Sequence, residues 1–434
     1  MNNDFVAETA ARFDIPGGAV GVLHDGQEHF FNHGVTSVEN PLPVNEDTLF
    51  LLGSVTKTFT ATAIMRLVAQ DRVSLDAPVR EYVPELTLLD DREFTVRQLL
   101  NHTSGLDWGT LADTGEGDDA LARHVAELAT LKLIAPVGER PSYSQSGFNL
   151  AGRIIENVTG QTYEQAMTSL LLEPIGLGNT HFDRDAVMTR RFAAGHEKGE
   201  IARPWRHWRG NNPGGGIAAS VKDLLAWARF HLGDGDGVDL AEMRRPTALL
   251  RGSNLGDAIG VGWFLREIDG VQAIGHGGSS NGQFAELLLV PSRNFAVVSV
   301  ANQGPDGIPF NQAMVRRALE HFVGLLDRDP EPLPYNAVQA AEVAGGYDND
   351  AMVMTIDDTG AGLVLEVLIR PEIRESAEME LPADHAPFPM ALLPRDEYMI
   401  TDGAFTGQRG FFTRDTQGVI IGVDLAGRMF GRVG

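Results

Sequence analysis

The stretch Leu51–Met65 reads LLGSVTKTFTATAIM, and we expect the rest of the chain to be organised around it. Its apolar and small residues recur at helical spacing, and Gly53 permits a tight entry before the run. Ser54 is therefore expected at or near the N-terminus of a helix, with Lys57 three residues later on the same face. The pattern places a hydroxyl beside an amine, close to the unpaired N–H groups of the helix start.

This pairing of side chains has a chemical meaning. A serine hydroxyl becomes a useful nucleophile only when a neighbouring base takes its proton. A lysine amine can be that base when burial or a nearby cation lowers its pKa, whereas arginine does not deprotonate. The chain has lysine only at positions 57, 132, 198 and 222, which makes Lys57 informative. A surface lysine beside an ordinary helix cap fits the same short spacing, so this segment alone leaves both interpretations open.

Composition excludes several classes of partner. A chain of 434 residues is long enough for two or three domains, and its net charge of −24 argues against nucleic acid or an anionic membrane surface. There is no cysteine, which excludes disulfides and thiol catalysis. The N-terminus lacks a signal-peptide pattern and no apolar run approaches a membrane span, so we expect a cytoplasmic protein. The sequence shows neither metal-ligand spacing nor a phosphate-binding loop, so no metal or other cofactor is expected.

The order of patterns along the chain favours an α+β fold. Residues 17–34 predict a hairpin around Asp25-Gly26, and residues 262–301 predict further strands. Helical patterns lie between them, at residues 147–159, 163–172 and 220–232. We therefore expect a catalytic domain over residues 1–328, with an antiparallel sheet flanked by helices and a helical subdomain. A charged, proline-rich segment at 327–334 marks the boundary, and closely spaced short strands over 335–434 predict a small all-β barrel or sandwich.

Two further stretches offer partners for the serine. The polar turn at residues 141–147 carries Tyr143, whose hydroxyl could relay a proton if an adjacent cation lowered its pKa. Residues 275–282 read GHGGSSNG, which we interpret as a glycine turn between two strands whose N–H groups could stabilise an oxyanion. Taken alone, Tyr143 is more often a packing residue and His276 more often a structural one. His102 is interpreted as structural.

Taken in order, Ser54-x-x-Lys57, Tyr143-x-Gln145 and His276-Gly277-Gly278 resemble the three motifs of the penicillin-binding-protein and serine β-lactamase superfamily. Further stretches resemble its class C β-lactamase-like branch: Leu99–Leu106, Pro213–Gly216 with Ser220-x-x-Asp223, and Leu289–Pro291. The resemblance covers roughly residues 5–325. Each motif is weak alone, but their order is specific.

The resemblance implies a role for each matched residue. Ser54 would be the acylated nucleophile, Lys57 would share its proton, and Tyr143 would act as general base and then as acid to the leaving group. The backbone N–H groups of Ser54 and Ser279 would form the oxyanion hole. The remaining matched residues are Gln145 and Gly278 in the substrate-binding and oxyanion region, and His276 in the position of the third-motif lysine.

Two departures from the family pattern affect the expected substrate. His276 replaces a permanently charged lysine, and a histidine is mostly neutral at pH 7, so recognition of a substrate carboxylate should weaken. Weaker carboxylate recognition speaks against β-lactam hydrolysis and D,D-carboxypeptidase action. A histidine-glycine motif at this position is similar to that of the D-aminopeptidase, esterase and macrocyclase branches. Gln145 replaces asparagine, so the amide that would contact Lys57 or a substrate carbonyl stands on a longer side chain than in the family motif. Several of those branches append lipocalin-like β-domains, which the C-terminal module resembles.

The sequence therefore predicts a serine hydrolase that acts through an acyl-enzyme on an amide or ester bond of a small-molecule or short-peptide substrate, with a preference for a small peptide or amide that carries a D-residue. A carboxylesterase, a peptide cyclase and a non-turnover sensor on the same fold are the alternatives. The aromatic and basic loop at residues 205–209 is a further candidate pocket wall.

Overall fold

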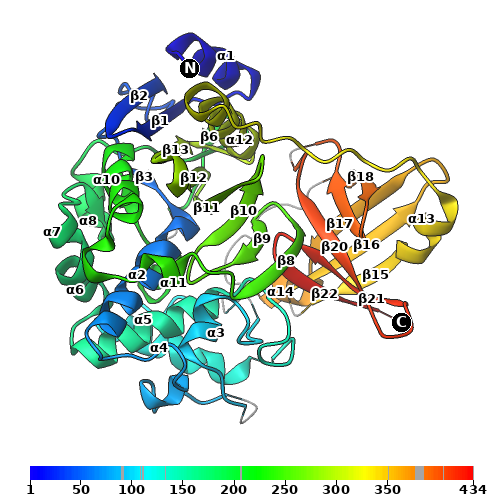
Figure 1. Cartoon of the computed structure of the whole chain (residues 1–434), viewed down its shortest axis with the longest axis horizontal. Coiled ribbons are helices and arrows are strands. Elements are labelled where there is room, and N and C mark those ends of the chain that lie inside the picture. Colours follow the sequence, from blue (N-terminus) through cyan, green and yellow to red (C-terminus); the bar gives the residue numbers. More distant parts are fainter. Residues whose placement is uncertain are drawn as a thin grey trace. The chain divides into compact units, whose positions relative to one another are not determined.

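The computed structural model describes residues 1–88, 92–107, 109, 112–131, 133–205, 208–349, 351–376, 386–403 and 405–433. Two compact units form. The larger unit, which carries the predicted catalytic residues and is called the catalytic unit below, comprises Met1–Leu249 and Ala258–Asp327, and the barrel unit comprises Leu250–Asp257 and Arg328–Gly434. The fold is α+β, as predicted, with a large mixed unit followed by a mainly β one (Figure 1).

An eight-stranded sheet has the order β2-β1-β13-β12-β11-β10-β9-β8. The predicted hairpin forms β1 and β2, and β1 pairs antiparallel with β13, so the two ends of the sequence pattern meet in one sheet. The sequence did not predict β8 and β9. The strands are β1 (Gly17–His24), β2 (Gln27–Gly34), β8 (Ala248–Ser253), β9 (Gly256–Ile259), β10 (Phe264–Ile268), β11 (Val271–Ser280), β12 (Gln283–Val290) and β13 (Phe295–Ala301).

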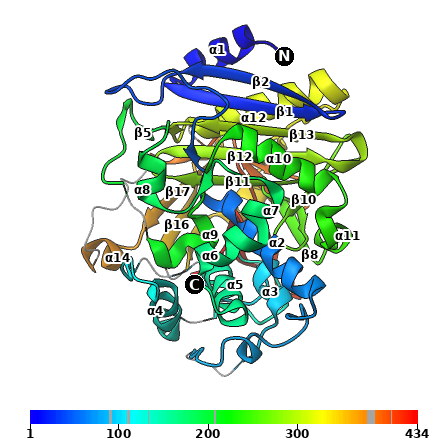
Figure 2. The same cartoon turned by 90° about the vertical axis from the view of Figure 1, so that its left-hand side faces the viewer.

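Helices cover both faces of this sheet. On one face α1 (Asn3–Arg12) and α12 (Gly307–Ala318) share a buried apolar cluster with the sheet, and Figure 2 shows α1 beside β2 and β1. On the other face the cluster includes α2 (Thr56–Ala69), α5 (Gln145–Thr159) and α10 (Val221–Leu232). Side chains alternate along a strand, so β11 sends Ile274 to the α2 face and Ala273 to the α12 face.

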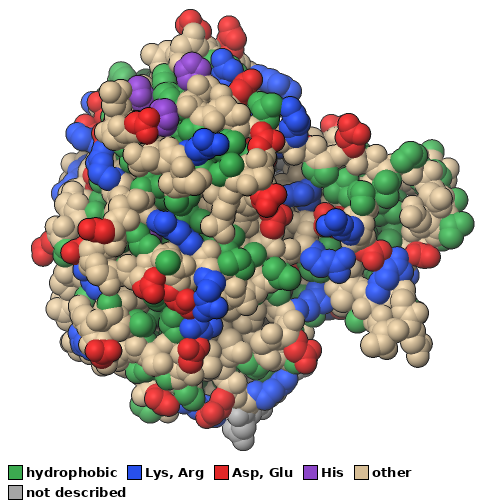
Figure 3. All heavy atoms as spheres, viewed as in Figure 1, with side chains coloured by type: hydrophobic (Ala, Val, Ile, Leu, Met, Phe, Trp, Pro, Cys, Tyr) green, Lys and Arg blue, Asp and Glu red, His purple; other side chains and the backbone are tan. Residues whose placement is uncertain are grey.

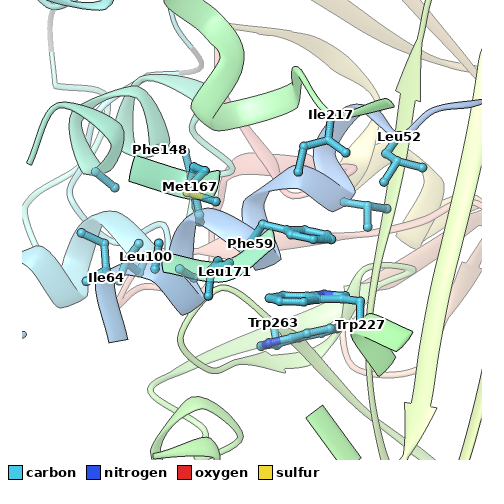
Figure 4. Packing of buried hydrophobic residues seen from close by; sticks show 14 of the residues in the cluster. Leu52, Phe59, Ile64, Leu100, Phe148, Met167, Leu171, Ile217, Trp227 and Trp263 are labelled. Carbon is cyan, nitrogen blue, oxygen red and sulfur yellow. The ribbon is translucent and has the colours of Figure 1, made fainter. Parts of the chain in front are cut away.

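Helix α2 is buried almost all round. Phe59 stacks on Trp227 of α10 with ring centroids 3.9 Å apart, and Trp263 lies on the far side of Trp227 (Figure 4). The indole N–H of Trp227 also donates to the Thr58 hydroxyl over 3.2 Å. A helix buried on all sides is fixed by packing, so its first turn has a defined position relative to the sheet.

Two further helices of the catalytic unit begin at serine caps, of which the sequence pattern predicted only the one at Ser220. Ser144 and Ser220 are the N-caps of α5 and α10, each accepting from the backbone N–H three residues ahead. The remaining helices are α3 (Val96–Leu100), α4 (Ala120–Glu127), α6 (Tyr163–Met167), α7 (Glu173–Ile175), α8 (Arg184–Met188), α9 (Asn212–Gly215) and α11 (Leu240–Met243). Short strands complete the unit: β3 (Phe50–Leu51), β4 (Thr180–His181), β5 (His196–Glu197), β6 (Glu200–Ile201), β7 (Ala218–Ala219) and β14 (Gln303–Gly304).

The C-terminal strands close into a barrel, β15 to β22, which confirms the barrel over the sandwich. Its interior holds Tyr347, Tyr398 and Phe412, all fully buried. The elements are α13 (Ala337–Val343), β15 (Gly345–Asp348), β16 (Met352–Asp358), β17 (Leu363–Ile369), α14 (Pro371–Ser376), β18 (Phe388–Leu393), β19 (Glu397–Ile400), β20 (Arg409–Arg414), β21 (Ile420–Leu425) and β22 (Arg428–Arg432).

Charged side chains of both signs are interspersed on the face seen in Figure 3. In the part of the chain that the structure describes, no helix is both long and apolar enough to cross a lipid bilayer.

Candidate active site

Ser54 lies in a single turn of 3-10 helix, η1 (Gly53–Val55), which leads directly into α2. Gly53 has a φ of +50°, and a Cβ atom there would lie 2.6 Å from the backbone nitrogen of Ser279 and overlap its carbonyl group. Only glycine tolerates both the dihedral and the close approach. The turn therefore presses against β11, and the Ser54 side chain remains half-buried rather than enclosed.

The third motif is part of a strand and not the glycine turn expected from the sequence. His276–Ser280 continue β11, with Gly277 opposite Glu286 and Ser279 opposite Phe284 on β12. Glycines weaken the local strand signal, but pairing with β12 carries the strand through them. A Cβ atom on Gly278 would lie 2.6 Å from the Ser54 nitrogen, so this glycine completes the tight junction between β11 and η1.

Lys57 is fully buried, and its Nζ donates to three oxygens. The acceptors are Gln145 Oε1 at 2.5 Å, the Gly214 carbonyl at 2.7 Å and Ser54 Oγ at 3.3 Å. An ammonium has three N–H groups and satisfies all three acceptors. A neutral amine has two, which the carbonyl oxygens would take, leaving its lone pair directed at the serine hydroxyl. The arrangement thus accommodates both protonation states of a lysine that exchanges a proton with Ser54.

Tyr143 immediately precedes Ser144, the N-cap of α5, so the start of this helix fixes the position of the Tyr143 backbone. Lys57 Nζ lies 4.9 Å from the centre of the Tyr143 ring. His102 packs against Tyr143, with the two ring centroids 4.6 Å apart. The Ser144 N–H donates to His102 Nδ1 over 3.1 Å. His102 thus supports the segment that carries Tyr143, as its structural interpretation expects.

Gln145 reaches Lys57 in spite of its longer side chain. The amide nitrogen donates to Asn211 Oδ1 over 2.8 Å, which orients the oxygen toward the lysine. A Cβ atom on Gly214 would overlap the Gln145 amide, so the absence of a side chain at 214 provides the space for the longer arm. The same glycine supplies a carbonyl to Lys57. Sequence reasoning missed Asn211 and the matching of Gly214 to Gln145.

His276 occupies the third-motif position as a neutral side chain. It is only 4% exposed, and burial together with the nearby Lys57 cation lowers its pKa to about 3. Its Nδ1 lies 2.6 Å from the Gly277 carbonyl, which can only accept, so the proton is on Nδ1. The site therefore has no fixed positive charge at the position where the third-motif lysine of the superfamily would stand.

One edge of β11 is open beside Ser54. Pairing with β10 ends at Gly275, whereas pairing with β12 continues to Ser280. Within the described residues, no strand pairs with the second edge of His276–Ser280. Backbone groups along such an edge can bind an extended peptide as an added strand. Ser279 is exposed at this edge, next to the turn that carries Ser54.

The loop at residues 205–209 lies only partly within the described residues, because Arg206 and His207 are outside them. Trp205 packs on Phe192 with ring centroids 5.4 Å apart. Arg209 forms ion pairs with Asp118 at 2.8 Å and Glu164 at 3.2 Å. Arg209 also lines a separate surface cavity of about 520 Å³ beside α6 and α8, whose lining includes none of the three motifs.

The site brings together a serine, a lysine, a tyrosine and a neutral histidine from segments that lie far apart in sequence. This is the arrangement of an S-x-x-K serine hydrolase on an α+β fold. The family model described as Beta-lactamase matches residues 2–321, and the chain belongs to that family of serine hydrolases.

Individual relatives agree with this assignment. Penicillin-binding protein 4 of Amycolatopsis lactamdurans is 33% identical over 360 residues, covering 77% of this chain and 94% of the relative. The crystal structure of SurE with D-Leu superposes with a TM-score of 0.75 at 26% identity, covering 99% of this chain and 98% of that one. A class C β-lactamase has the same fold, with a TM-score of 0.62 at 24% identity over 72% of this chain and 94% of its own.

Proposed function

We propose that the protein cleaves an amide or ester bond in a small peptide or amide with a D-residue, through an acyl-enzyme on Ser54. The Ser54 hydroxyl attacks the substrate carbonyl while Tyr143, with Lys57 beside it, takes the proton. The N–H groups of Ser54 and Ser279 hold the oxyanion of the tetrahedral intermediate. Tyr143 then returns the proton to the departing amine or alcohol, and water, activated in the same way, releases the acyl group.

The contact between Lys57 and Ser54 carries this proposal. A fully buried lysine that touches the hydroxyl and two carbonyl oxygens is costly to maintain as a purely structural feature. The same three acceptors suit an amine that gains and loses a proton during each half-reaction.

Three observations favour a short D-residue amide over a β-lactam. A neutral His276 offers no permanent charge to the carboxylate that penicillins and D,D-carboxypeptidase substrates carry. SurE, similar to this chain over nearly its whole length, has been solved with D-Leu. The open edge of β11 suits a short extended peptide.

Three substrate types test the proposal: D-alanine p-nitroanilide, p-nitrophenyl acetate and a linear peptidyl thioester with a free N-terminus. A fluorophosphonate and intact-protein mass spectrometry report whether Ser54 is reactive, and Ser54→Ala is the matched control. We expect adduct formation and amide turnover in the unaltered protein and neither in the variant. Turnover of esters alone would replace the amidase with an esterase, and a cyclised product would indicate a peptide cyclase. A stable adduct without any turnover would favour the sensor.

A further inference from the structure

Glu286 on β12 lies beside the third motif, on the other face of the strand from His276. It pairs in register with Gly277, and because side chains alternate, both face away from α2. A Cβ atom on Gly277 would lie 2.8 Å from Glu286 Oε2. The carboxylate therefore rests over the backbone of Gly277, in space that a side chain at 277 would fill. Gly278 and Ser279, the next residues of the open edge, adjoin Ser54.

The surroundings of this carboxylate leave its acceptor capacity unused. In the described part of the chain, no side chain donates a hydrogen bond to Glu286 or forms an ion pair with it. Arg266 on β10 is nearby, but it pairs with Asp327 at 2.7 Å, and Arg316 of α12 also approaches Asp327, at 3.5 Å. On β13 the residue opposite Glu286 is the uncharged Ser299. Burial raises the pKa of Glu286 to about 7, Arg266 opposes that rise and Asp327 reinforces it.

A structural role does not account for this arrangement. A half-buried carboxylate normally gains hydrogen bonds or a cation that offset its loss of water. Glu286 has neither from the described residues, yet Gly277 leaves it room at the edge where the substrate is proposed to lie. A partly buried carboxylate that lacks a side-chain donor, and that lies against the strand proposed to bind the substrate, is suited to complete its contacts with a ligand.

We propose that Glu286 binds the free ammonium group of a short peptide or amino-acid amide at the edge of β11, and disfavours substrates with a carboxylate there. The proposal rests on the proposed function, because it assumes a substrate held next to Ser54. With His276 neutral on one face of the strand and Glu286 on the other, the edge selects for a cation. A charge-assisted hydrogen bond to the ammonium would give that preference its strength.

Protection of Ser54 from fluorophosphonate labelling tests this without requiring turnover. The competitors are D-leucinamide, which carries an ammonium, and N-acetyl-D-leucinamide, which does not. In the unaltered protein we expect D-leucinamide to protect at a concentration about tenfold lower or more, since a hydrogen bond between charged groups is worth at least that factor. Glu286→Gln should abolish the preference. Glu8→Gln, which removes an exposed carboxylate from α1, should keep it.

The pH dependence gives a second test in the unaltered chain. Protonation of Glu286 as the pH falls below about 7 removes its charge, so protection by D-leucinamide should weaken while that by the acetylated amide stays constant. Equal protection by the two competitors, or a preference that survives Glu286→Gln, would overturn the inference. If Ser54 fails to label even without a competitor, the proposed function itself fails. If only the Glu286→Gln protein fails to label, the two competitors and their pH dependence in the unaltered chain decide.

Discussion

Each of the two units places a tyrosine ring beside a cation, with different consequences. In the barrel, Arg432 lies 5.7 Å from the centre of the fully buried Tyr347, whose hydroxyl donates to the Val343 carbonyl over 2.6 Å. In the catalytic unit, Lys57 lies 4.9 Å from the centre of the half-buried Tyr143. Burial raises the pKa of Tyr347. Arginine does not release its proton, so the barrel pair is purely structural, whereas lysine beside a serine can take part in proton transfer.

The largest effect is expected when Lys57 is replaced by arginine, the cation found beside Tyr347 in the barrel. Lys57→Arg keeps the positive charge but replaces the lysine with a side chain that does not release a proton at neutral pH. We expect kcat/KM to fall by about 10³-fold, within the range for loss of a general acid–base group. Activity on whichever of the three test substrates the unaltered protein turns over measures this, and near-ultraviolet circular dichroism controls for folding. A Lys57→Arg protein with nearly full activity would show that Lys57 serves only as a charge.

Removing the hydroxyl from Tyr143 is the next largest effect. Tyr143→Phe retains the ring over Lys57, so packing should survive, while kcat/KM should fall by about 10²-fold through loss of proton transfer. The matched control is Tyr398→Phe in the barrel, where activity should not change. Equal activities of the two variants would contradict the proposed role of Tyr143.

The fit between Gln145 and Gly214 should give a smaller effect. Gly214→Ala would push the Gln145 amide away from Lys57, and we expect about a tenfold loss of activity from one weakened buried hydrogen bond. Adding Gln145→Asn shortens the side chain and should recover part of that loss, a coupling that a double-mutant cycle detects. Additive losses would mean that the two positions act independently.

Acid should distinguish the units through their histidines. Burial lowers the pKa values of His102, His124, His231 and His276, all in the catalytic unit, whereas the only histidine of the barrel sequence, His385, lies outside the described residues. Their folded pKa values are below the unfolded ones, so their contribution to stability is fully present above about pH 6.5 and is lost as the pH falls. Each histidine changes the free energy of unfolding by at most about 1.4 kcal/mol for every pH unit.

Urea titrations at several pH values measure this effect, and they should show the catalytic unit weakening first. His231→Phe should reduce the slope of stability against pH, because it removes one of the buried groups that must charge. A loss of stability confined to the barrel would contradict the expectation.

The smallest effect concerns the barrel alone. The Tyr398 hydroxyl donates to the Asp424 carbonyl over 2.9 Å, so Tyr398→Phe should lower the free energy of unfolding by about 1 kcal/mol, the net worth of a buried hydrogen bond. Denaturant unfolding followed by tyrosine fluorescence measures the change. No change in stability would show that the carbonyl finds another donor.

Local signals account for what the sequence predicted. The hairpin at Asp25-Gly26, the cap at Ser220 and the serine–lysine spacing all depend on residues within four positions of one another. The strand character of His276–Ser280 was missed because it comes from pairing with β12, against the local preference of glycine. The partners of Gln145 and the position of Glu286 depend on pairings between separate segments of the chain. The hydrophobic pattern along a single segment does not reveal such pairings.

The glycine junction between η1 and β11 also affects how the protein fails. At Gly53 and Gly278 the backbone of the turn lies directly against the backbone of β11, so the position of the nucleophile depends on that strand. Heat inactivation and melting of the central sheet should therefore coincide as one event, with no folded but idle intermediate. The residual activity after heating would then equal the fraction of molecules that are still folded.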